Sequence, residues 1–395
     1  MKKKVLLAFS GGLDTSYCAK YLSEVEKYDV HSAIVNTGGF SAEDLATIEQ
    51  TAYKLGVSSH TVLDITQDYY QKCIRYMVYG NVLRNNTYPL SVSSERTFQA
   101  LALVEYAIKI GVDAIAHGST GAGNDQIRFE SAFIILAPDI EVIAPIREMK
   151  LSRQQEIDFL KEHGIDGDWK KAEYSINQGI WGTSIGGKET LSSNTGLPEA
   201  AYLKQLKKQT PEKIELQFEK GEITGVNGQL IANKVQLINK IEELASAFAI
   251  GRDIHLGDTI IGIKGRVGFE AAAALLIIKA HHALEKHVLT KWQLHHKDYL
   301  ANIYGMMLHE SQYFEPVMRD IEAFLENNQK NVTGKVFIKL MPYHFQIEGI
   351  ESEFDLMNSE FGNYGEENKS WTAQDVIGFT NIMSNQMKIY HQINK

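Results

Sequence analysis

Short apolar runs alternate with longer amphipathic segments through about the first 165 residues of the chain. The run Val5–Phe9 is apolar throughout, which is typical of a strand buried on both faces of a sheet. This alternation predicts an α/β fold with a doubly wound parallel sheet, whose ligands bind beyond the carboxyl ends of its strands. The other expected strands are Val30–Thr37, Thr61–Ile65, Ala114–His117 and Glu141–Ala144.

Helix-start signals follow several of these strands. Ser41 with Asp44 three residues later resembles a capping box, and Ser152 with Gln155 repeats the pattern. We therefore assign residues 1–165 to a first, nucleotide-binding domain. The other helices expected here run over 15–25, with Tyr17, Tyr21, Leu22 and Val25 on one side, and over 94–110.

The pattern changes to that of an α+β domain after a Gly- and Ser-rich passage, Gly179 to Gly196. The last segment, 372–393, has an apolar stripe that needs a partner, and a neighbouring subunit is one candidate. We expect a multimerisation domain over 166–365 and a C-terminal oligomerisation helix over 366–395. The expected elements are the hairpin Glu215–Phe218 with Ile223–Val226 before the turn Asn227-Gly228, helices 233–248 and 268–289, and strands 259–264, 335–341 and 345–349.

The turn Ser10–Ser16, directly after the first strand, has the composition of a phosphate-binding loop. A strand, a glycine turn and a helix start leave free backbone N–H groups, with the positive end of the helix dipole behind them. Gly11 and Gly12 let the backbone approach a phosphate without Cβ obstruction, and three hydroxyls add donors. The spacing excludes a G-x-x-x-x-G-K-[ST] loop and, at this strand, a G-x-G-x-x-G loop.

Composition narrows the class of protein. A net charge of −9 without an extended basic run argues against a nucleic-acid partner. Cys18 and Cys73 lack the spacing of a zinc site or a disulfide framework. The first residues are too short for a signal peptide, and Lys279 interrupts the most apolar later run, so no membrane partner is expected. A cytoplasmic location is the expectation.

The segment Ala116–Glu130 is the second informative stretch. Glycines, hydroxyls, an amide, a carboxylate and an arginine follow an expected strand within fifteen residues. Such loops are often simple connections, but this position at a strand's carboxyl end favours a ligand site. Asn124 can donate and accept hydrogen bonds, Asp125 can orient an amine, and Arg128 can bind a carboxylate.

Together these stretches resemble a known family. Ser10–Ser16 is similar to the pyrophosphate loop (SGGxD[ST]S) of the ATP pyrophosphatase superfamily, whose fold is adenine nucleotide alpha-hydrolase-like. Its members cleave ATP between the α- and β-phosphates and adenylate a substrate oxygen. The whole set resembles the argininosuccinate synthase family over nearly the full chain: Ala8–Ser16, Tyr88–Arg96, His117–Glu130, Tyr174-Ser175 and Trp181–Ser184.

The resemblance implies a ligase of arginine biosynthesis. It would join citrulline and aspartate through citrullyl-AMP, giving argininosuccinate, AMP and pyrophosphate, with Mg²⁺ bridging the phosphates of ATP, in a homotetramer. By matching position, ATP would be bound by Ala8, Phe9, Ser10, Gly11, Gly12, Leu13, Asp14, Thr15, Ser16, Asn36 and Gly118. Citrulline would be held by Tyr88, Ser93, Arg128, Ser175 and Ser184, and aspartate by Thr120, Asn124 and Asp125. Asp14, Ser16, Asp125 and Arg128 form the expected catalytic set.

Two further substrate-binding positions depart from the family pattern. Gly257 and Phe269 stand where the family has a Glu and a Tyr that help to hold citrulline. The missing carboxylate removes the natural partner of a charged α-amino group, and an unpaired buried ammonium is unfavourable. The sequence therefore leaves open an enzyme that uses an Nα-acylated citrulline, or one that binds the amino group through other residues.

Two other functions compete with this interpretation. A tRNA-thiolating enzyme of the same superfamily needs basic surface and a reactive cysteine, which the acidic composition disfavours. A non-catalytic nucleotide sensor is disfavoured by the complete set of polar residues in both loops. The pairs His281-His282 and His295-His296 are not expected to bind metal, because neighbouring histidines on a helix point apart.

Overall fold

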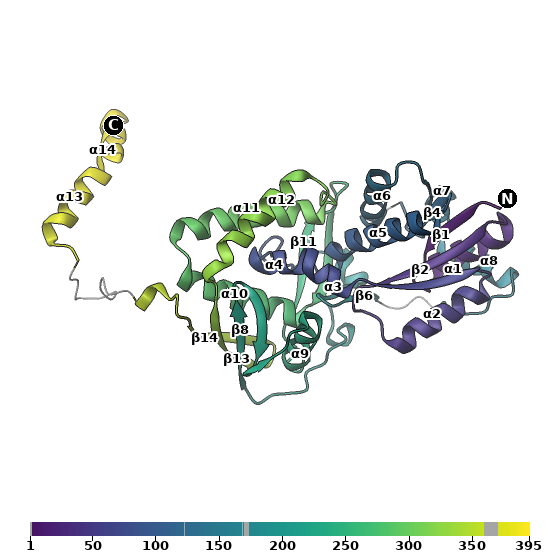
Figure 1. Ribbon diagram of the computed structural model, residues 1–395, viewed down its shortest axis with the longest axis horizontal. Coiled ribbons are helices and arrows are strands. Elements are labelled where there is room, and N and C mark those ends of the chain that lie inside the picture. The colour runs from purple at the N-terminus through teal and green to yellow at the C-terminus, as the bar shows by residue number, and fades with distance from the viewer. Residues whose placement is uncertain (1, 122, 168, 170–173, 359–369) are drawn as a thin grey trace.

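The protein was analysed as a computed structural model that describes residues 2–121, 123–167, 169, 174–358 and 370–395. Figure 1 shows a parallel sheet with its helices at one end of the molecule and antiparallel sheets with long helices in the middle. The C-terminal helices lie apart from both. Within this part of the chain, every helix is too short or too polar to traverse a lipid bilayer.

The first sheet has five parallel strands in the order β3-β2-β1-β4-β5. Val5 and Leu7 of its central strand pack toward helices α1 and α8, whereas Leu6 packs toward α5 and α6 on the opposite face. The predicted doubly wound α/β sheet is confirmed. Its strands are β1 (Lys4–Ala8), β2 (Asp29–Asn36), β3 (Ser59–Asp64), β4 (Ala114–Ala116) and β5 (Glu141–Ile143). Its helices are α1 (Leu13–Lys20), α2 (Ala42–Lys54), α5 (Ser91–Ile110), α6 (Asp125–Leu136), α7 (Pro145–Glu148) and α8 (Arg153–Glu162).

Both predicted capping boxes are present. Ser41 Oγ accepts from the Asp44 N–H at 3.1 Å, and Asp44 Oδ2 accepts from the Ser41 N–H at 2.9 Å. Ser152 and Gln155 make the same exchange at the start of α8. Each box satisfies two backbone donors that a helix start leaves free, which fixes where α2 and α8 begin.

The first helix is less regular than expected. After Lys20 it continues as a π-helical turn, η1 (Tyr21–Val25). Leu22 is fully buried, but Val25 is 48% exposed. The prediction that Val25 shares the buried side is wrong, because a π turn has more residues per turn than an α-helix and so changes which residues share a face.

The second half contains two antiparallel sheets. Their strand orders are β10-β9-β8-β13-β14 and β11-β12-β7-β6. The predicted hairpin, the helix over 233–248 and the last two strands are confirmed. The strands are β6 (Ser175–Gly179), β7 (Gly182–Gly186), β8 (Glu212–Glu219), β9 (Glu222–Val226), β10 (Gln229–Leu230), β11 (Arg252–Asp258), β12 (Lys264–Glu270), β13 (Gly334–Met341) and β14 (His344–Glu351).

Two predictions in this half are wrong. The strand expected over 259–264 is mainly a turn between β11 and β12, closed by the Thr259 N–H donating to Ile263 O at 2.8 Å. The long helix begins at 272, because 268–270 belong to β12. The passage 179–196 contains most of the hairpin β6–β7. The helices of this half are α9 (Lys234–Ser246), α10 (Ala272–Val288), α11 (Lys291–His309) and α12 (Pro316–Asn328).

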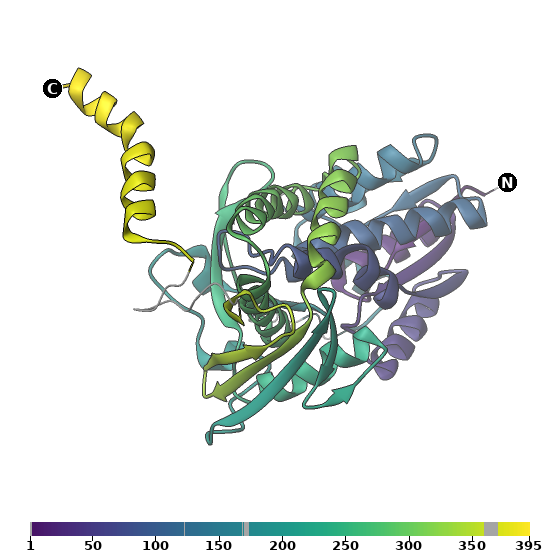
Figure 2. The same ribbon diagram turned by 60° about the vertical axis from the view of Figure 1, so that its left-hand side comes forward.

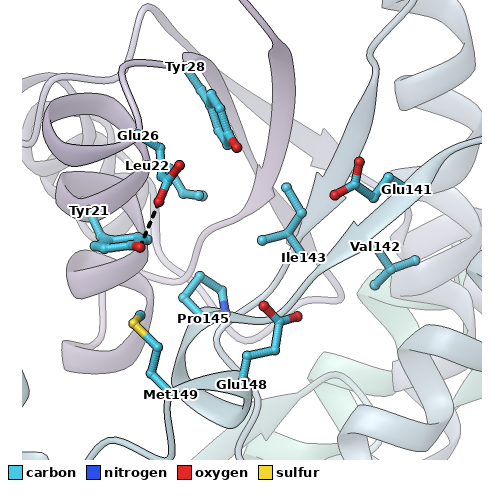
Figure 3. Close-up of a pocket in the computed structure, with 10 residues that line it drawn as sticks. All are labelled: Tyr21, Leu22, Glu26, Tyr28, Glu141, Val142, Ile143, Pro145, Glu148 and Met149. Carbon is cyan, nitrogen blue, oxygen red and sulfur yellow. Dashed lines mark hydrogen bonds between the residues drawn. The ribbon is translucent and has the colours of Figure 1, made fainter.

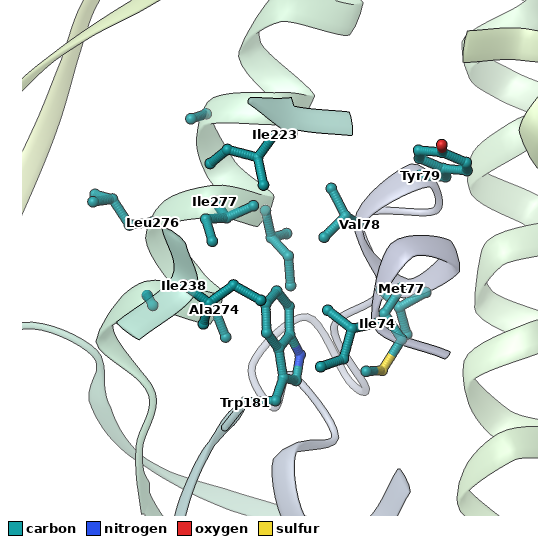
Figure 4. Packing of buried hydrophobic residues seen from close by; sticks show 14 of the residues in the cluster. Ile74, Met77, Val78, Tyr79, Trp181, Ile223, Ile238, Ala274, Leu276 and Ile277 are labelled. Carbon is teal, nitrogen blue, oxygen red and sulfur yellow. The ribbon is translucent and has the colours of Figure 1, made fainter. Parts of the chain in front are cut away.

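The largest hydrophobic core lies in the second half and includes a segment from the first. The core surrounds Trp181 and draws Ile74 and Met77 from the early segment against Ile277 of α10 (Figure 4). The Trp181 indole N–H donates to Pro89 O at 3.1 Å. The short helices α3 (Thr66–Tyr69) and α4 (Arg75–Tyr79), with the π turn η2 (Tyr70–Ile74) between them, lie against α9, α10 and α12. Residues 66–90 are therefore positioned by the second core.

The C-terminal segment forms two helices rather than one. Helix α13 (Ala373–Met383) and helix α14 (Asn385–Ile393) are separated at Ser384 and project away from the body in both views (Figures 1 and 2). The predicted stripe is exposed, and Ile382 has 74% of its surface accessible. The start of the expected oligomerisation helix at 366 lies outside the described residues.

Candidate functional site

A cavity of about 1220 Å³ lies beyond the carboxyl ends of β1 and β4. It lies next to β1, the point where the strand order reverses direction, which is where ligands bind in open α/β sheets. The cavity therefore combines the two loops that the sequence singled out. The predicted residues that line it are Ala8, Phe9, Ser10, Gly12, Leu13, Asp14, Thr15, Gly118, Thr120, Asn124, Asp125, Arg128 and Ser175.

A second cavity of about 200 Å³ lies beside the edge strand β5 (Figure 3). Its polar walls carry the carboxylates of Glu26, Glu141 and Glu148. The Tyr21 hydroxyl donates to Glu26 at 2.7 Å. Acidic walls repel phosphates, so the larger cavity is the candidate site.

The turn after β1 presents backbone donors to the larger cavity. Gly11 has φ +78°, a left-handed conformation that favours glycine. Gly12 caps α1 without a side-chain hydrogen bond, so the first N–H groups of the helix remain free for an anion. The Thr15 hydroxyl donates to Gly12 O at 3.2 Å, and Ser16 Oγ is buried without a partner among the described residues.

The second loop touches the first at Gly118. A Cβ on Gly118 would lie 3.2 Å from the backbone nitrogen of Thr15 and 3.2 Å from the carbonyl carbon of Asp14. Only a residue without a side chain permits this approach at unchanged backbone positions. The two loops thus form one continuous wall.

A buried carboxyl group supports the turn from below. Glu156 of α8 is 3% exposed and next to Asp14. Burial, followed by the negative charge of Asp14 and a hydrogen bond with it, raises the pKa of Glu156 to about 8. Glu156 therefore holds its proton more tightly than a carboxyl group in water does.

Asp125 lies between two arginines at the start of α6. Arg96 Nε donates to Asp125 Oδ2 at 3.2 Å, and Arg128 Nη1 donates to Asp125 Oδ1 at 2.9 Å. Burial acts against the charge of Asp125, but the two guanidinium groups outweigh it and lower its pKa. Arg96 also donates to Asn177 Oδ1 at 3.1 Å. The carboxyl group of Glu95 lies 3.6 Å from Arg96 Nη1, so two arginines and two carboxyl groups meet beside the cavity.

Arg128 is held from behind by α11. Its Nε and Nη2 donate to His309 O at 3.2 and 3.1 Å. The Ile260 N–H, in the turn between β11 and β12, donates to Asn124 Oδ1 at 3.0 Å. Elements from the second half therefore hold two residues that line the cavity, Arg128 and Asn124.

Tyr88 belongs to a buried aromatic group rather than to the cavity wall. Its ring stacks on His255 with centroids 5.2 Å apart and tilts against Phe269 at 5.3 Å. Its hydroxyl accepts from Ser91 Oγ at 3.2 Å. Phe269 is fully buried and pairs in register with Ser184 across β12 and β7. The expected citrulline residues thus divide between the cavity and the packed group behind it.

The remaining predicted residues also lie outside the lining. Asn36 Oδ1 accepts from the Gly38 N–H at 2.9 Å, and the Ser93 hydroxyl donates to Leu90 O at 3.4 Å. Gly257 is buried on β11, paired with Gly265. The predicted residues that do not line the cavity are Gly11, Ser16, Asn36, Tyr88, Ser93, Ser184, Gly257 and Phe269.

Several lining residues were absent from the predicted set. The cavity is also lined by Arg96, Gln99 and Asn177. The residues next to them in the sequence did not indicate a binding role. Arg96 ends the stretch Tyr88–Arg96, which is the one signal that could have identified it. Glu95 beside it is buried, which raises the pKa of its carboxyl to about 7. A Cβ on Gly179 would lie 2.1 Å from Glu95 Oε2, which explains glycine there.

Family models match both halves of the chain. The model described as the arginosuccinate synthase N-terminal HUP domain matches residues 4–166, and the arginosuccinate synthase C-terminal domain matches residues 174–390. The chain belongs to the argininosuccinate synthase family. It is therefore a ligase of α/β class, as the sequence predicted, and the family and the names of its members favour neither a tRNA-thiolating enzyme, nor a nucleotide sensor, nor an Nα-acylated citrulline as the substrate.

Curated relatives agree over the full length. An argininosuccinate synthase from Methanocaldococcus jannaschii is 34% identical over 398 residues, covering 100% of each chain. Another from Dictyoglomus turgidum is 36% identical over 391 residues, covering 98% of each chain. A third from Bacillus licheniformis is 35% identical, covering 100% of this chain and 98% of its own. The similarity is not confined to the nucleotide loop.

Proposed function

We propose that this chain joins a ureido amino acid, citrulline, to aspartate and converts ATP into AMP and pyrophosphate. The observation that carries the proposal is the contact between the two loops at Gly118, in a cavity that also holds the Asp125–Arg128 pair. An anion-binding turn and a charged cluster in one cavity suit a triphosphate and two amino acids.

The turn Ser10–Ser16 would hold ATP, with Ala8, Phe9, Asn36 and Gly118 around it. The unpartnered Ser16 hydroxyl and the uncapped start of α1 fit a pyrophosphate group. The carboxylate of Asp14 fits a Mg²⁺ ion, which prefers oxygen ligands. When bound, Mg²⁺ supplies positive charge that neutralises the phosphates.

The reaction needs alignment more than covalent catalysis. The ureido oxygen would attack the α-phosphorus, the bond to the β-phosphate oxygen would break, and pyrophosphate would leave. The aspartate amine would then attack the ureido carbon, and AMP would leave with the oxygen. The chain's residues would hold three charged molecules in line, which is a large part of the rate enhancement in such reactions.

The cluster at the start of α6 would hold the amino-acid substrates. Thr120, Asn124 and Asp125 would bind aspartate, the carboxylate of Asp125 facing its amine. Arg128 and Ser175 would bind the α-carboxylate of citrulline. Tyr88, Ser93 and Ser184 would support this part of the site from the packed residues behind the cavity wall. Asp14, Ser16, Asp125 and Arg128 remain the proposed catalytic set, and Arg96 joins it because it binds Asp125.

The test is product analysis. Phosphorus NMR of full-length protein with ATP, Mg²⁺, citrulline and aspartate should show AMP and pyrophosphate in equal amounts, with both amino acids required for complete turnover. Formation of ADP and orthophosphate would contradict the proposal, because the turn would then expose the γ-phosphorus instead of the α-phosphorus.

The assembly would be a homotetramer held partly through α13 and α14. Their apolar side chains are exposed along both helices, and exposed stripes of this kind seek a partner. Light scattering should report a tetramer that Ile382→Glu dissociates, whereas Lys388→Glu should not. A tetramer unchanged by Ile382→Glu would contradict this role.

We also infer a division into domains over 1–165, 166–365 and 366–395, and a cytoplasmic location. The two cysteines are buried and free, which suits a reducing compartment. Fractionation of cells that produce the protein would test the location.

A further inference from the structure

A basic cluster lies directly behind Arg128. Arg84 comes from the turn that ends at Tyr88, His255 from β11 and His309 from the end of α11. Arg84 Nη2 lies 3.5 Å from Asp258 O, and His309 Nδ1 lies 3.4 Å from Arg128 Nη2. Arg128 lines the cavity, so the cluster adjoins the end of the site that would hold the amino-acid part of citrulline.

Two polar atoms of this cluster have no partner. Arg84 Nε and His255 Nδ1 are buried without a hydrogen bond to any described residue. Within the described part of the chain, Arg84 has no carboxylate oxygen within 4 Å and acts on Asp258 only at longer range, and His255 is only 5% exposed. Buried donors and acceptors are usually satisfied, and each one left without a partner destabilises the fold. Unpaired atoms beside His309, which itself contacts the cavity residue Arg128, indicate a ligand.

The cluster is unsuited to an ammonium group. A Cβ on Gly257 would lie 2.5 Å from His255 Nε2, so the imidazole occupies the space that a side chain at 257 would need. Of the nearby carboxylates, Asp258 pairs with Lys264 at 2.7 Å, and Asp253 accepts from the Ile254 N–H at 2.7 Å. Both carboxylates belong to exposed residues.

The electrostatics favour an anion. Burial and then the positive charge of Arg84 lower the pKa of His255 to about 4. Burial, Arg128 and Arg84, in that order, lower the pKa of His309 to about 3. Both imidazoles are therefore neutral at pH 7, and the two guanidinium groups set a positive potential at this end of the site.

We propose that Arg84 and His255 form an anion subsite, and that the ureido substrate is a citrulline whose α-nitrogen carries an acyl group ending in a carboxylate. This inference rests on the proposed function. Acylation converts the ammonium into a neutral amide, which needs no carboxylate partner at position 257. The terminal carboxylate pairs with Arg84, which otherwise lacks an ionic partner. The ureido group is untouched, so the ligation chemistry is the same.

The first experiment compares three substrates with full-length protein. Pyrophosphate release is measured with citrulline, Nα-acetylcitrulline and Nα-succinylcitrulline at saturating ATP and aspartate. We expect kcat/KM to rise in this order, with about tenfold or more between the first and the last. A preference for free citrulline overturns the inference and leaves the proposed function intact. Absence of AMP and pyrophosphate with all three overturns the proposed function itself.

The second experiment removes the positive charge of Arg84. Arg84→Gln should lower kcat/KM for Nα-succinylcitrulline by about tenfold and leave Nα-acetylcitrulline unchanged, because only the former has a carboxylate to lose its partner. Lys264→Gln is the matched control, an equal charge change at an exposed position of β12. The Arg84 side chain makes a single long hydrogen bond, so the melting temperature should stay near that of the parent. An equal loss for both acyl substrates overturns the assignment.

A third variant tests the opposite possibility. If Asp253 binds an ammonium group, Asp253→Asn should raise KM for free citrulline several-fold. That outcome overturns the inference. An unchanged KM supports the inference. Asp253 is the carboxylate whose charge acts on the pKa of His255, so it is the nearest candidate partner for an ammonium group there.

Discussion

The two ends of the cavity use different kinds of groups to bind their ligands. The nucleotide end is made of backbone: a left-handed Gly11, an uncapped helix start and the close approach at Gly118. The substrate end is made of side-chain charges, in which Asp125 lies between Arg96 and Arg128 and Arg128 is held by α11. Backbone sites depend on the shape of the chain, whereas side-chain clusters depend on which charges meet. Substitutions should therefore affect the two ends in separable ways.

The largest effect should come from the charge between the arginines. Asp125→Asn keeps the shape but leaves two guanidinium groups without their shared anion, so we expect kcat/KM for aspartate to fall by about 10²–10³-fold. KM for ATP should change little, because the backbone end is untouched. Steady-state pyrophosphate release as a function of each substrate measures both.

The control for that change is Asp139→Asn, which removes an exposed carboxylate shortly after the same helix. It should leave both constants at parent values. If Asp125→Asn raised KM for ATP as strongly as KM for aspartate, the separation between the two ends would be wrong.

Gly118→Ala should have a smaller effect, and on the binding of ATP rather than of aspartate. The new Cβ would meet Thr15 and Asp14 at 3.2 Å, so the loops must move apart and the anion site would widen. We expect KM for ATP to rise about tenfold and KM for aspartate to stay within about twofold. Gly196→Ala is the control, since nothing lies within 4 Å of a Cβ there. A selective rise in KM for aspartate would refute the assignment of this contact to the nucleotide end.

The smallest effect concerns the support beneath the turn. The pKa of Glu156 is about 8 in the folded protein, above the 4.5 that applies when it is exposed on unfolding. Between these values, the unfolded chain releases a proton that the folded chain keeps, so this group lowers stability progressively as pH rises from about 4.5 to 8. Glu156→Gln removes that dependence.

Melting temperatures test this directly. Glu156→Gln should match the parent near pH 5 and melt a few degrees higher near pH 8. Glu162→Gln, on an exposed position of the same helix, should follow the parent at both values. A variant that is less stable at pH 8 than the parent would show that Glu156 is ionised in the folded protein.

Sequence patterns predicted the parallel half well because its signals are local. The apolar run at β1 and the capping boxes at Ser41 and Ser152 depend on neighbouring residues only. The prediction of a strand over 259–264 is wrong because this segment is mainly the turn between β11 and β12. The position of β12 also depends on its pairing with β7, which is distant in sequence. Helices α11 and α12, which the pattern did not predict, are also held by tertiary packing.

The site divides in the same way. Glycines and hydroxyls of the nucleotide loop are adjacent in sequence, and the structure places most of them on the cavity. Arg96 and His309 reach Asp125 and Arg128 from distant segments, so no spacing along the chain indicates these contacts, and only the family resemblance of the stretch Tyr88–Arg96 pointed toward Arg96. The pattern placed Tyr88 and Phe269 in substrate binding, and the structure adds that they pack on each other around His255.

The insertion of residues 66–90 into the second core has a consequence for separating the halves. Tyr69, Cys73 and Met77 are fully buried there. A fragment that ended at residue 165 would expose these side chains to water. A fragment that began after residue 165 would lack them, and its hydrophobic core would contain a cavity at their positions. Gene splitting at this point should yield two insoluble products, whereas co-expression should let each complete the other.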